Sequence, residues 1–235
     1  MTSPSDRLAS FAEVLFTDKA LIAVNKRPGV CVIPGRGDGD SLSLREMVER
    51  EFGKKIYVVH RIDRETSGVV VFCSTAEMHR RLSMQFEKRT VRKEYRALVE
   101  GIVSGTGLID APIRQFGSGR MGVDTRNGKP SLTEITAVEQ LGGAALVNVQ
   151  PATGRRHQIR VHLYHSGHPV MGDTLYGCER PVGGVERMML HAAAVTFAGP
   201  EGEPLTITAP VDFQWKEIVQ RFSPHHEPDR GGVCS

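Results

Sequence analysis

The stretch from Ile56 to Cys73 constrains the fold of this chain more than any other. Two apolar runs rich in β-branched residues, IYVV and GVVVFC, flank the polar insert HRIDRETS. Short apolar runs of this composition are typical of buried β-strands, and a polar insert that leads into glycine is typical of a loop between them. The sequence therefore predicts two buried strands joined by a highly charged loop at 60–68.

The rest of the chain alternates strand patterns with a few helices. Helices are expected at 43–52, 74–89, 155–166 and 212–221; the first begins with Ser43 and Glu46 at capping-box spacing. Strands are expected within 13–33 around a turn at 27–29, at 95–99, across 106–150 with a hairpin turn at 142–143, and in a last hairpin closed by GPEGEP. Residues 34–41 are expected to form a loop. The fold class expected is α+β: a mixed, largely antiparallel sheet with flanking helices and a central cleft that holds the 60–68 loop.

Composition excludes several classes of protein. Of 235 residues, 40% are hydrophobic and 24% are charged, as in an ordinary globular domain. No apolar run approaches the roughly 20 residues that span a bilayer, and the N-terminus lacks a signal-peptide pattern. The four cysteines form no CxxC pair, which favours reduced thiols over a zinc ribbon or disulfide framework. We expect a cytoplasmic protein without membrane contact, with one catalytic domain over 1–222 and a frayed tail over 223–235.

The distribution of charge permits a nucleic-acid partner without requiring one. The net charge is only +3, but basic residues crowd into 79–96 and recur in 114–129. Such segments can supply salt-sensitive contacts to phosphates. They are equally typical of a solvated helix face, which charge alone favours.

The polar insert at 60–68 is the first candidate for chemistry. Arg61 and Arg64 flank Asp63, and their charge would keep this carboxylate ionised and available as a nucleophile. A comparison with the H-R-D loop of protein kinases fails on spacing and on the missing asparagine, glycine loop and D-F-G motif. A surface ion-pair cluster remains the alternative.

The second candidate is the cluster at 154–162, GRRHQIRVH. On a helix, His157, Arg160 and Tyr164 would share one face. A metal site built from the histidines at 157, 162, 165 and 168 is disfavoured, because the H-E-x-x-H spacing is absent. Arg160 reaching a partner carboxylate is favoured instead, because guanidinium is permanently charged and binds carboxylates through two N–H groups.

Five segments together resemble one enzyme family. HRIDRETSGVVVF is similar to the H-R-[LI]-D-R-[DE]-T-S-G signature of the ribosomal-large-subunit type A (RluA) family of pseudouridine synthases. GRRHQIRVHLYHSGHPVMGDTLYG, RKEYRALVEG, LHAAAVTF and VNKRPGV resemble further motifs of that family, in family order. The resemblance covers roughly residues 13–212 and implies the pseudouridine synthase catalytic fold.

The resemblance also implies roles for individual residues. Asp63 would be the catalytic nucleophile and Arg160 would pair with it. Tyr95 would stack on the target uracil and is the candidate for proton handling, and Arg61 would fill the space that the flipped base leaves in the RNA. Apolar walls of the uracil pocket would come from Ile159 and Leu190. The predicted substrate-binding set also includes His60, Arg64 and His157, and the two histidines are expected to act mainly as hydrogen-bonding scaffold.

The implied reaction is the isomerisation of specific uridines in a structured tRNA or rRNA stem-loop. Breaking the N1–C1′ bond and rejoining uracil through C5 yields an isomer, so we expect no cofactor, no metal and no small-molecule partner. The base must be extruded and held, which suits an aromatic platform and a substitute in the stack. Whether the carboxylate attacks C1′, adds to C6 or deprotonates the sugar stays open. We expect a monomer.

Some features depart from the family pattern or allow another function. Arg27, Arg156 and Gly199 stand where the family usually has Pro, Thr and His, which bears on substrate choice. Only about a dozen residues precede the first motif, so we expect the compact form without an S4-like RNA-binding domain. A catalytically silent RNA-binding protein and a glycosidase using Glu65 as a second carboxylate are the alternatives.

Overall fold

The computed structural model describes residues 8–34, 42–177 and 182–223 of the chain. The expected loop at 34–41 lies outside these residues from position 35 onward, and the expected tail lies outside them from position 224 onward. None of the described helices combines the length and the apolar character that crossing a bilayer requires.

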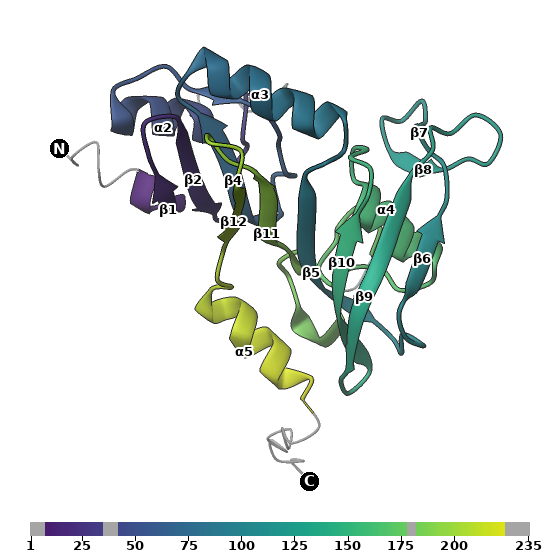
Figure 1. The fold of residues 1–235 in the computed structure, drawn as a ribbon. Coiled ribbons are helices and arrows are strands. Elements are labelled where there is room, and N and C mark those ends of the chain that lie inside the picture. The colour runs from purple at the N-terminus through teal and green to yellow at the C-terminus, as the bar shows by residue number, and fades with distance from the viewer. Residues whose placement is uncertain (1–7, 35–41, 178–181, 224–235) are drawn as a thin grey trace, which may run out of the picture.

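A large sheet of ten strands organises the fold (Figure 1). Its main path runs in the order β1-β2-β4-β11-β5-β10-β9-β6, with β12 paired to β11 and β3 paired to β4. These strands are β1 (Ala12–Thr17), β2 (Leu21–Lys26), β3 (Tyr57–Val58), β4 (Ser67–Cys73), β5 (Arg92–Glu100), β6 (Gly107–Asp110), β9 (Leu132–Gln140), β10 (Ala144–Pro151), β11 (Leu190–Ala198) and β12 (Pro204–Thr208). The pairing of β11 with β4 is parallel, and the other pairings in this sheet are antiparallel. The expected α+β class with a mixed, largely antiparallel sheet is confirmed.

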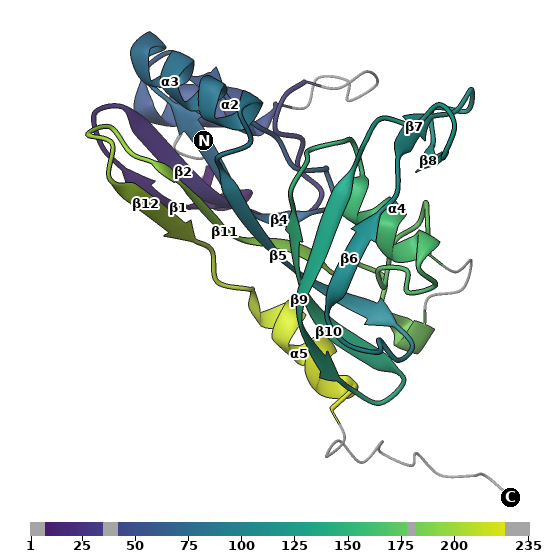
Figure 2. The same cartoon turned by 45° about the vertical axis from the view of Figure 1, so that its right-hand side comes forward.

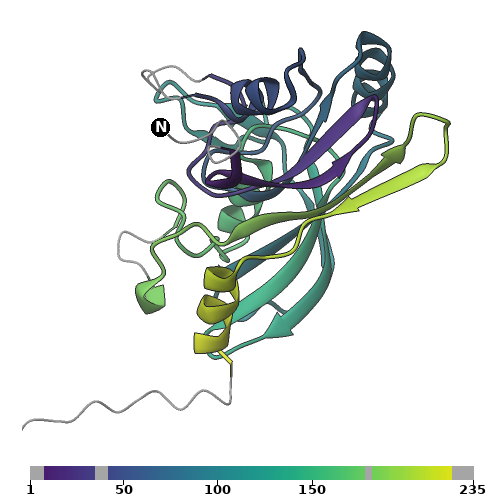
Figure 3. The same ribbon diagram turned by 90° about the vertical axis from the view of Figure 1, so that its left-hand side faces the viewer.

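Two helices cover opposite faces of the N-terminal half of this sheet. Helix α2 (Leu44–Phe52) packs with Ile22, Val24, Val70 and Phe72, whereas α3 (Ala76–Glu87) packs with the alternate residues Leu21, Ala23, Val69 and Val71. Successive strand residues point to opposite faces, so β2 and β4 are apolar on both sides and must be covered twice. Figure 3 separates the two helices on either side of these strands.

The C-terminal half has its own core around β5 and β10. Helix α4 (Gln158–His165) contributes Ile159 and Leu163 to this core, and α5 (Phe213–Arg221) adds Trp215 and Ile218. A separate hairpin of β7 (Ile113–Gln115) and β8 (Met121–Val123) packs against α4 through Ile113 and Val161. Figure 2 shows α4 beside this hairpin, apart from α2 and α3.

Several local expectations hold and others need correction. The capping box of α2 is present, with Ser43 N–H donating to Glu46 Oε2 at 2.9 Å. The cap of α3 is Thr75 rather than Ser74, and α4 begins at Gln158 rather than at 155. The turn between the first two strands was expected at 27–29, which is wrong. It lies at 18–20, where Asp18 Oδ1 accepts the Ala20 and Leu21 N–H groups at 2.7 and 2.6 Å.

Glycine at position 68 is required by the sheet itself. Gly68 has a φ of 111°, and a Cβ atom there would lie 2.1 Å from the carbonyl oxygen of Ala192. The parallel β11 strand approaches β4 at this point. The glycine that ends the polar insert therefore allows β4 to pair with β11 immediately after the charged loop.

Candidate active site

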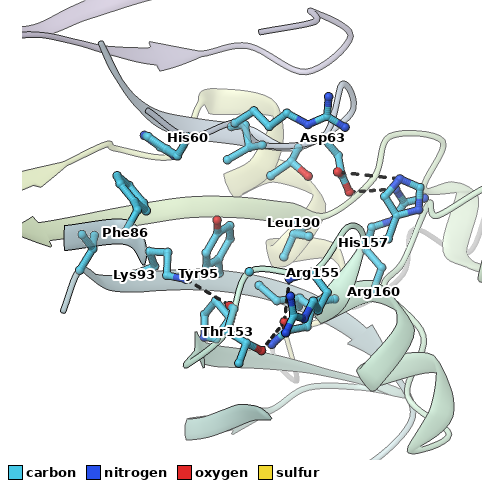
Figure 4. Close-up of a pocket in the computed structure, with 18 of the residues that line it drawn as sticks. His60, Asp63, Phe86, Lys93, Tyr95, Thr153, Arg155, His157, Arg160 and Leu190 are labelled. Atoms are coloured by element: carbon cyan, nitrogen blue, oxygen red, sulfur yellow. Dashed lines mark hydrogen bonds and ion pairs between the residues drawn. The ribbon is translucent and has the colours of Figure 1, made fainter. Parts of the chain in front are cut away.

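The loop between β3 and β4 places Asp63 at the edge of a cavity of about 510 Å³. The cavity is lined by the 59–66 loop, the C-terminal end of α3, strand β5, the 151–160 segment and Leu190 of β11. Eight of the predicted site residues line it: Asp63, Tyr95, Arg160, Arg61, His60, Ile159, His157 and Leu190. Figure 4 shows how these side chains converge from separate elements of the fold.

Arg64 is the exception among the predicted substrate-binding residues. It is not part of the cavity lining. Its guanidinium Nε donates to the Gly29 carbonyl at 3.0 Å and lies 3.7 Å from Glu65 Oε1. Arg64 therefore ties the loop to the segment after β2, and it lines a second, neighbouring cavity together with Asp63 and Glu65.

A buried lysine anchors the same loop from behind. Lys26 is fully buried at the end of β2, and its Nζ donates to the carbonyls of Arg27 and Arg64 at 2.8 Å each. Burial lowers the pKa of Lys26 to about 7, against the opposing pull of nearby Glu65 and Asp63. The Arg64 carbonyl also accepts the Gly29 N–H at 2.9 Å, so the residue after Asp63 is held by three contacts to the β2 end.

Arg160 links Asp63 to a second carboxylate, Asp173. Its Nη1 donates to Asp63 Oδ2 at 3.0 Å, while its Nε and Nη2 donate to Asp173 Oδ2 and Oδ1 at 2.6 and 2.8 Å. Burial works to raise the pKa of Asp173, but its bonds to Arg160 outweigh that effect and lower it. Burial likewise works to lower the pKa of Arg160, and the two carboxylates outweigh it and raise the pKa. Both groups therefore stay charged, and the Nη1 group of the guanidinium remains available to Asp63.

His157 faces the other oxygen of Asp63. Its Nε2 lies 3.8 Å from Asp63 Oδ1, and its Nδ1 lies 2.9 Å from the hydroxyl of Tyr176. Burial lowers the pKa of His157 to about 4, so the imidazole is neutral at neutral pH. The Tyr176 oxygen also accepts the Met121 N–H at 3.1 Å, so the start of β8 and the His157 ring share one anchor.

The backbone of His157 explains this orientation. His157 has a φ of 56° and precedes α4 instead of belonging to it, contrary to the expected helical face shared with Arg160 and Tyr164. Tyr164 lines a different cavity, beside the β7–β8 hairpin. Gln158 fixes the turn: its Oε1 accepts from Thr153 Oγ1 at 2.6 Å and from Arg155 N–H at 3.0 Å, and its Nε2 donates to the Leu132 carbonyl at 2.9 Å.

Tyr95 lies on β5 in the wall of the cavity, between Asp63 and the far end (Figure 4). Burial and the charge of Asp63 raise its pKa, so the phenol keeps its proton. His60 serves the scaffold: its Nε2 accepts the Val71 N–H at 2.9 Å and its ring stacks on Phe86 with centroids 5.0 Å apart. Burial lowers the pKa of His60 to about 4, which keeps it neutral as this hydrogen bond requires.

The sequence predicted no role for three residues that the structure places at the site. Asp173 and Tyr176 belong to the GDTLYG stretch, which was matched as a motif without a function, and Lys26 belongs to VNKRPGV. Among the described residues, no group of three or more His, Cys, Asp or Glu side chains could hold a metal ion.

A carboxylate paired with an arginine, a neutral aromatic platform and apolar walls in one cavity suit an enzyme that handles a nucleobase. The family model for RNA pseudouridylate synthase matches residues 20–165, and the chain belongs to that family. It is an RNA pseudouridine synthase, which isomerises uridine.

Individual relatives agree with this assignment. The chain is 37% identical to ribosomal large subunit pseudouridine synthase C of Vibrio vulnificus, over 93% of this chain and 73% of that protein. It is 33% identical to tRNA pseudouridine synthase C of Haemophilus ducreyi, over 91% and 96% of the two chains. Human RNA pseudouridylate synthase domain containing 1 has a similar structure, with a TM-score of 0.73, 27% identity, and 93% and 97% of the two chains covered.

Proposed function

We propose that this enzyme modifies uridines in structured tRNA or rRNA and that Asp63 is its catalytic nucleophile. The contact between Asp63 Oδ2 and Arg160 Nη1 at 3.0 Å carries the proposal. It gives one carboxylate in the cavity wall a fixed orientation, with His157 beside its other oxygen. The relatives named for tRNA and for the large ribosomal subunit support these two RNA classes.

In the proposed reaction, the flipped uracil lies against Tyr95, between Ile159 and Leu190. Arg160 binds one oxygen of Asp63 and His157 lies beside the second, so the carboxylate is oriented before the base arrives. Attack at C1′, addition at C6 and abstraction of a sugar proton each begin from this anion. Because Tyr95 retains its proton, it serves first as a stacking surface, with its hydroxyl as a hydrogen-bond donor.

Arg61 is proposed to occupy the gap that the extruded base leaves. Its side chain is exposed at the rim of the cavity, on the same loop as Asp63. His60 supports the wall behind this loop, and Arg64 is proposed to act through the position of the loop rather than through contact with the base. The catalytic unit is proposed to comprise residues 1–222 as a cytoplasmic monomer.

The release of tritium from labelled RNA shows which class of RNA the enzyme modifies. Total RNA labelled at C5 of uridine is prepared from cells that lack the enzyme, separated into tRNA and rRNA, and incubated with the protein. We expect release from at least one fraction, since forming the new bond at C5 frees that hydrogen. Absence of release from both fractions would contradict the proposed substrate classes.

A further inference from the structure

The cavity extends beyond the end that holds Asp63. Its lining also includes Phe86, Arg89, Lys93, Thr153 and Arg155. In Figure 4, Phe86 and Lys93 lie on the side of Tyr95 away from Asp63. Uracil chemistry at Asp63 gives no role to the cations Arg89 and Lys93.

Lys93 brings a charge into the wall of the cavity. It lies two residues before Tyr95 on β5, so the two side chains share a face and their Cα atoms are about 7 Å apart. Its Nζ donates to the Thr153 carbonyl at 3.2 Å, and its two other N–H groups have no protein partner among the described residues. Burial, together with the neighbouring charge of Arg89, lowers the pKa of Lys93 to about 8.

Arg89 occupies a position that favours glycine. It follows Lys88, the cap at the end of α3, and has a φ of 59°, in the left-handed region that side chains rarely adopt. Helices commonly end with glycine there because a Cβ atom is disfavoured. An arginine held in this conformation beside Lys93 places a second cation against the cavity at a conformational cost.

The two cations at this end lack protein counter-ions. Within the described chain, no salt bridge joins Arg89 or Lys93 to a carboxylate, although Glu87 also lines the cavity. Two neighbouring like charges without a partner are unfavourable unless an anion joins them.

We propose that Arg89 and Lys93 form a phosphate subsite, which binds a phosphodiester of the RNA strand beside the flipped nucleotide. The subsite rests on the proposed function, because it takes the occupant of the Asp63 end to be a nucleotide of RNA. A base stacked on Tyr95 carries its backbone along the cavity, and the two-residue step to Lys93 brings a phosphate within reach of both cations. Contacts of this type position a strand without reading its sequence.

The test is a salt titration with a short probe, independent of turnover. Binding of a fluorescein-labelled pentauridylate is followed by fluorescence anisotropy over a range of KCl concentrations. For Lys93→Met and Arg89→Gly, the slope of log Kd against log[KCl] is expected to weaken by about 0.7 each, the value for one phosphate contact to a single strand. Lys93→Arg is expected to keep the parent slope. Lys88→Gln is the matched control, because it removes an adjacent exposed charge outside the cavity lining.

A second probe separates charge from packing. Pentauridylate with methylphosphonate linkages has the same bases and no backbone charge, so parent and Lys93→Met are expected to bind it equally. Arg89→Gly relieves the left-handed conformation and is expected to melt at or above the parent Tm while still losing the slope. The Arg89→Gly variant therefore tests the phosphate subsite even if Lys93→Met does not fold.

The subsite would be overturned by unchanged slopes in Arg89→Gly, by a slope loss as large in Lys88→Gln, or by equal parent affinity for the charged and neutral probes. Loss of Lys93→Met binding to the neutral probe would also overturn it, by assigning Lys93 to the cavity wall. Tritium release is measured separately. Release with unchanged slopes rejects the subsite alone, and altered slopes without release reject the proposed function alone.

Discussion

The guanidinium of Arg160 holds two carboxylates at once, with Asp173 gripped through two N–H groups and Asp63 through a third. Asp173 is fully buried, whereas Asp63 keeps 23% of its side chain exposed. The first carboxylate is thus a permanent counter-ion that sets the plane of the guanidinium. The second remains accessible to a substrate, and its position depends on the first.

Replacing Asp173 by Asn should therefore damage both folding and catalysis. One buried charge of the pair is removed, which destabilises proteins by about 3–5 kcal/mol. In the molecules that fold, Arg160 is free to rotate, so kcat should fall without a matching loss of RNA affinity. Urea denaturation and single-turnover kinetics measure the two effects. Arg92→Ala is the control, because its contact with Glu94 is exposed and worth at most about 1 kcal/mol. Equal losses in the two variants would contradict the role of Asp173.

Tyr95 is expected to contribute its ring to RNA binding. Tyr95→Leu should weaken the affinity for substrate RNA by about 1–3 kcal/mol, the usual contribution of one base–aromatic stack. Tyr95→Phe should retain most of that affinity, because the ring is kept. Both are measured in an Asp63→Asn background, so that turnover does not disturb the equilibrium. An equal loss in the Phe and Leu variants would assign the effect to the hydroxyl instead.

Stability should depend on pH through the buried histidines, His60 and His157 and also His162 and His191, whose pKa values burial lowers. Burial lowers the pKa of His60 and of His157 to about 4, below the ordinary value near 6.5. Between these values the unfolded chain binds more protons than the folded one, so the free energy of unfolding should rise as the pH rises from about 4 to about 6.5. Urea titrations across this range measure the slope, which His60→Gln should reduce. A stability that is flat across this range in the parent would contradict the assignment of neutral histidines.

Gly68 should tolerate no side chain. The Cβ atom of Gly68→Ala would meet the Ala192 carbonyl oxygen at 2.1 Å, so β4 and β11 must separate. We expect a loss of more than about 4 kcal/mol or failure to fold. Gly105→Ala is the matched control, since Gly105 has a φ of 124° but a Cβ atom there would meet nothing within 4 Å; it should cost about 1–3 kcal/mol of backbone strain alone. Similar Tm values for the two variants would refute the close-approach explanation.

The sequence predicts the sheet and the members of the site better than it predicts how they contact one another. A continuous apolar run rich in β-branched residues identifies β4, because burial on both faces leaves that signal in the strand itself. The partner of Asp63 was expected to be Arg160, and Arg160 Nη1 lies 3.0 Å from Asp63 Oδ2. Asp173 gave no comparable signal, since one aspartate in a glycine-rich loop becomes a counter-ion only through tertiary packing.

Backbone conformation accounts for the remaining differences. His157 was expected on the helix, but its left-handed φ turns the side chain toward Tyr176 and Asp63, and nothing in GRRHQIR indicates a break there. The turn expected at 27–29 has the typical Arg-Pro-Gly pattern, yet Asp18 makes the hairpin turn earlier and leaves Lys26 buried under the loop that carries Asp63. Such choices between local patterns depend on the packing of the whole sheet.

Asp63→Asn is the most direct test of the account, because it removes the charge of the proposed nucleophile while preserving its size. Tritium release from C5-labelled substrate RNA is compared for the parent and this variant, with RNA affinity measured in parallel. The account predicts release by the parent, no release by Asp63→Asn, and comparable RNA affinity for both proteins. Substantial release by Asp63→Asn would contradict the assignment of Asp63 as the residue that carries the reaction.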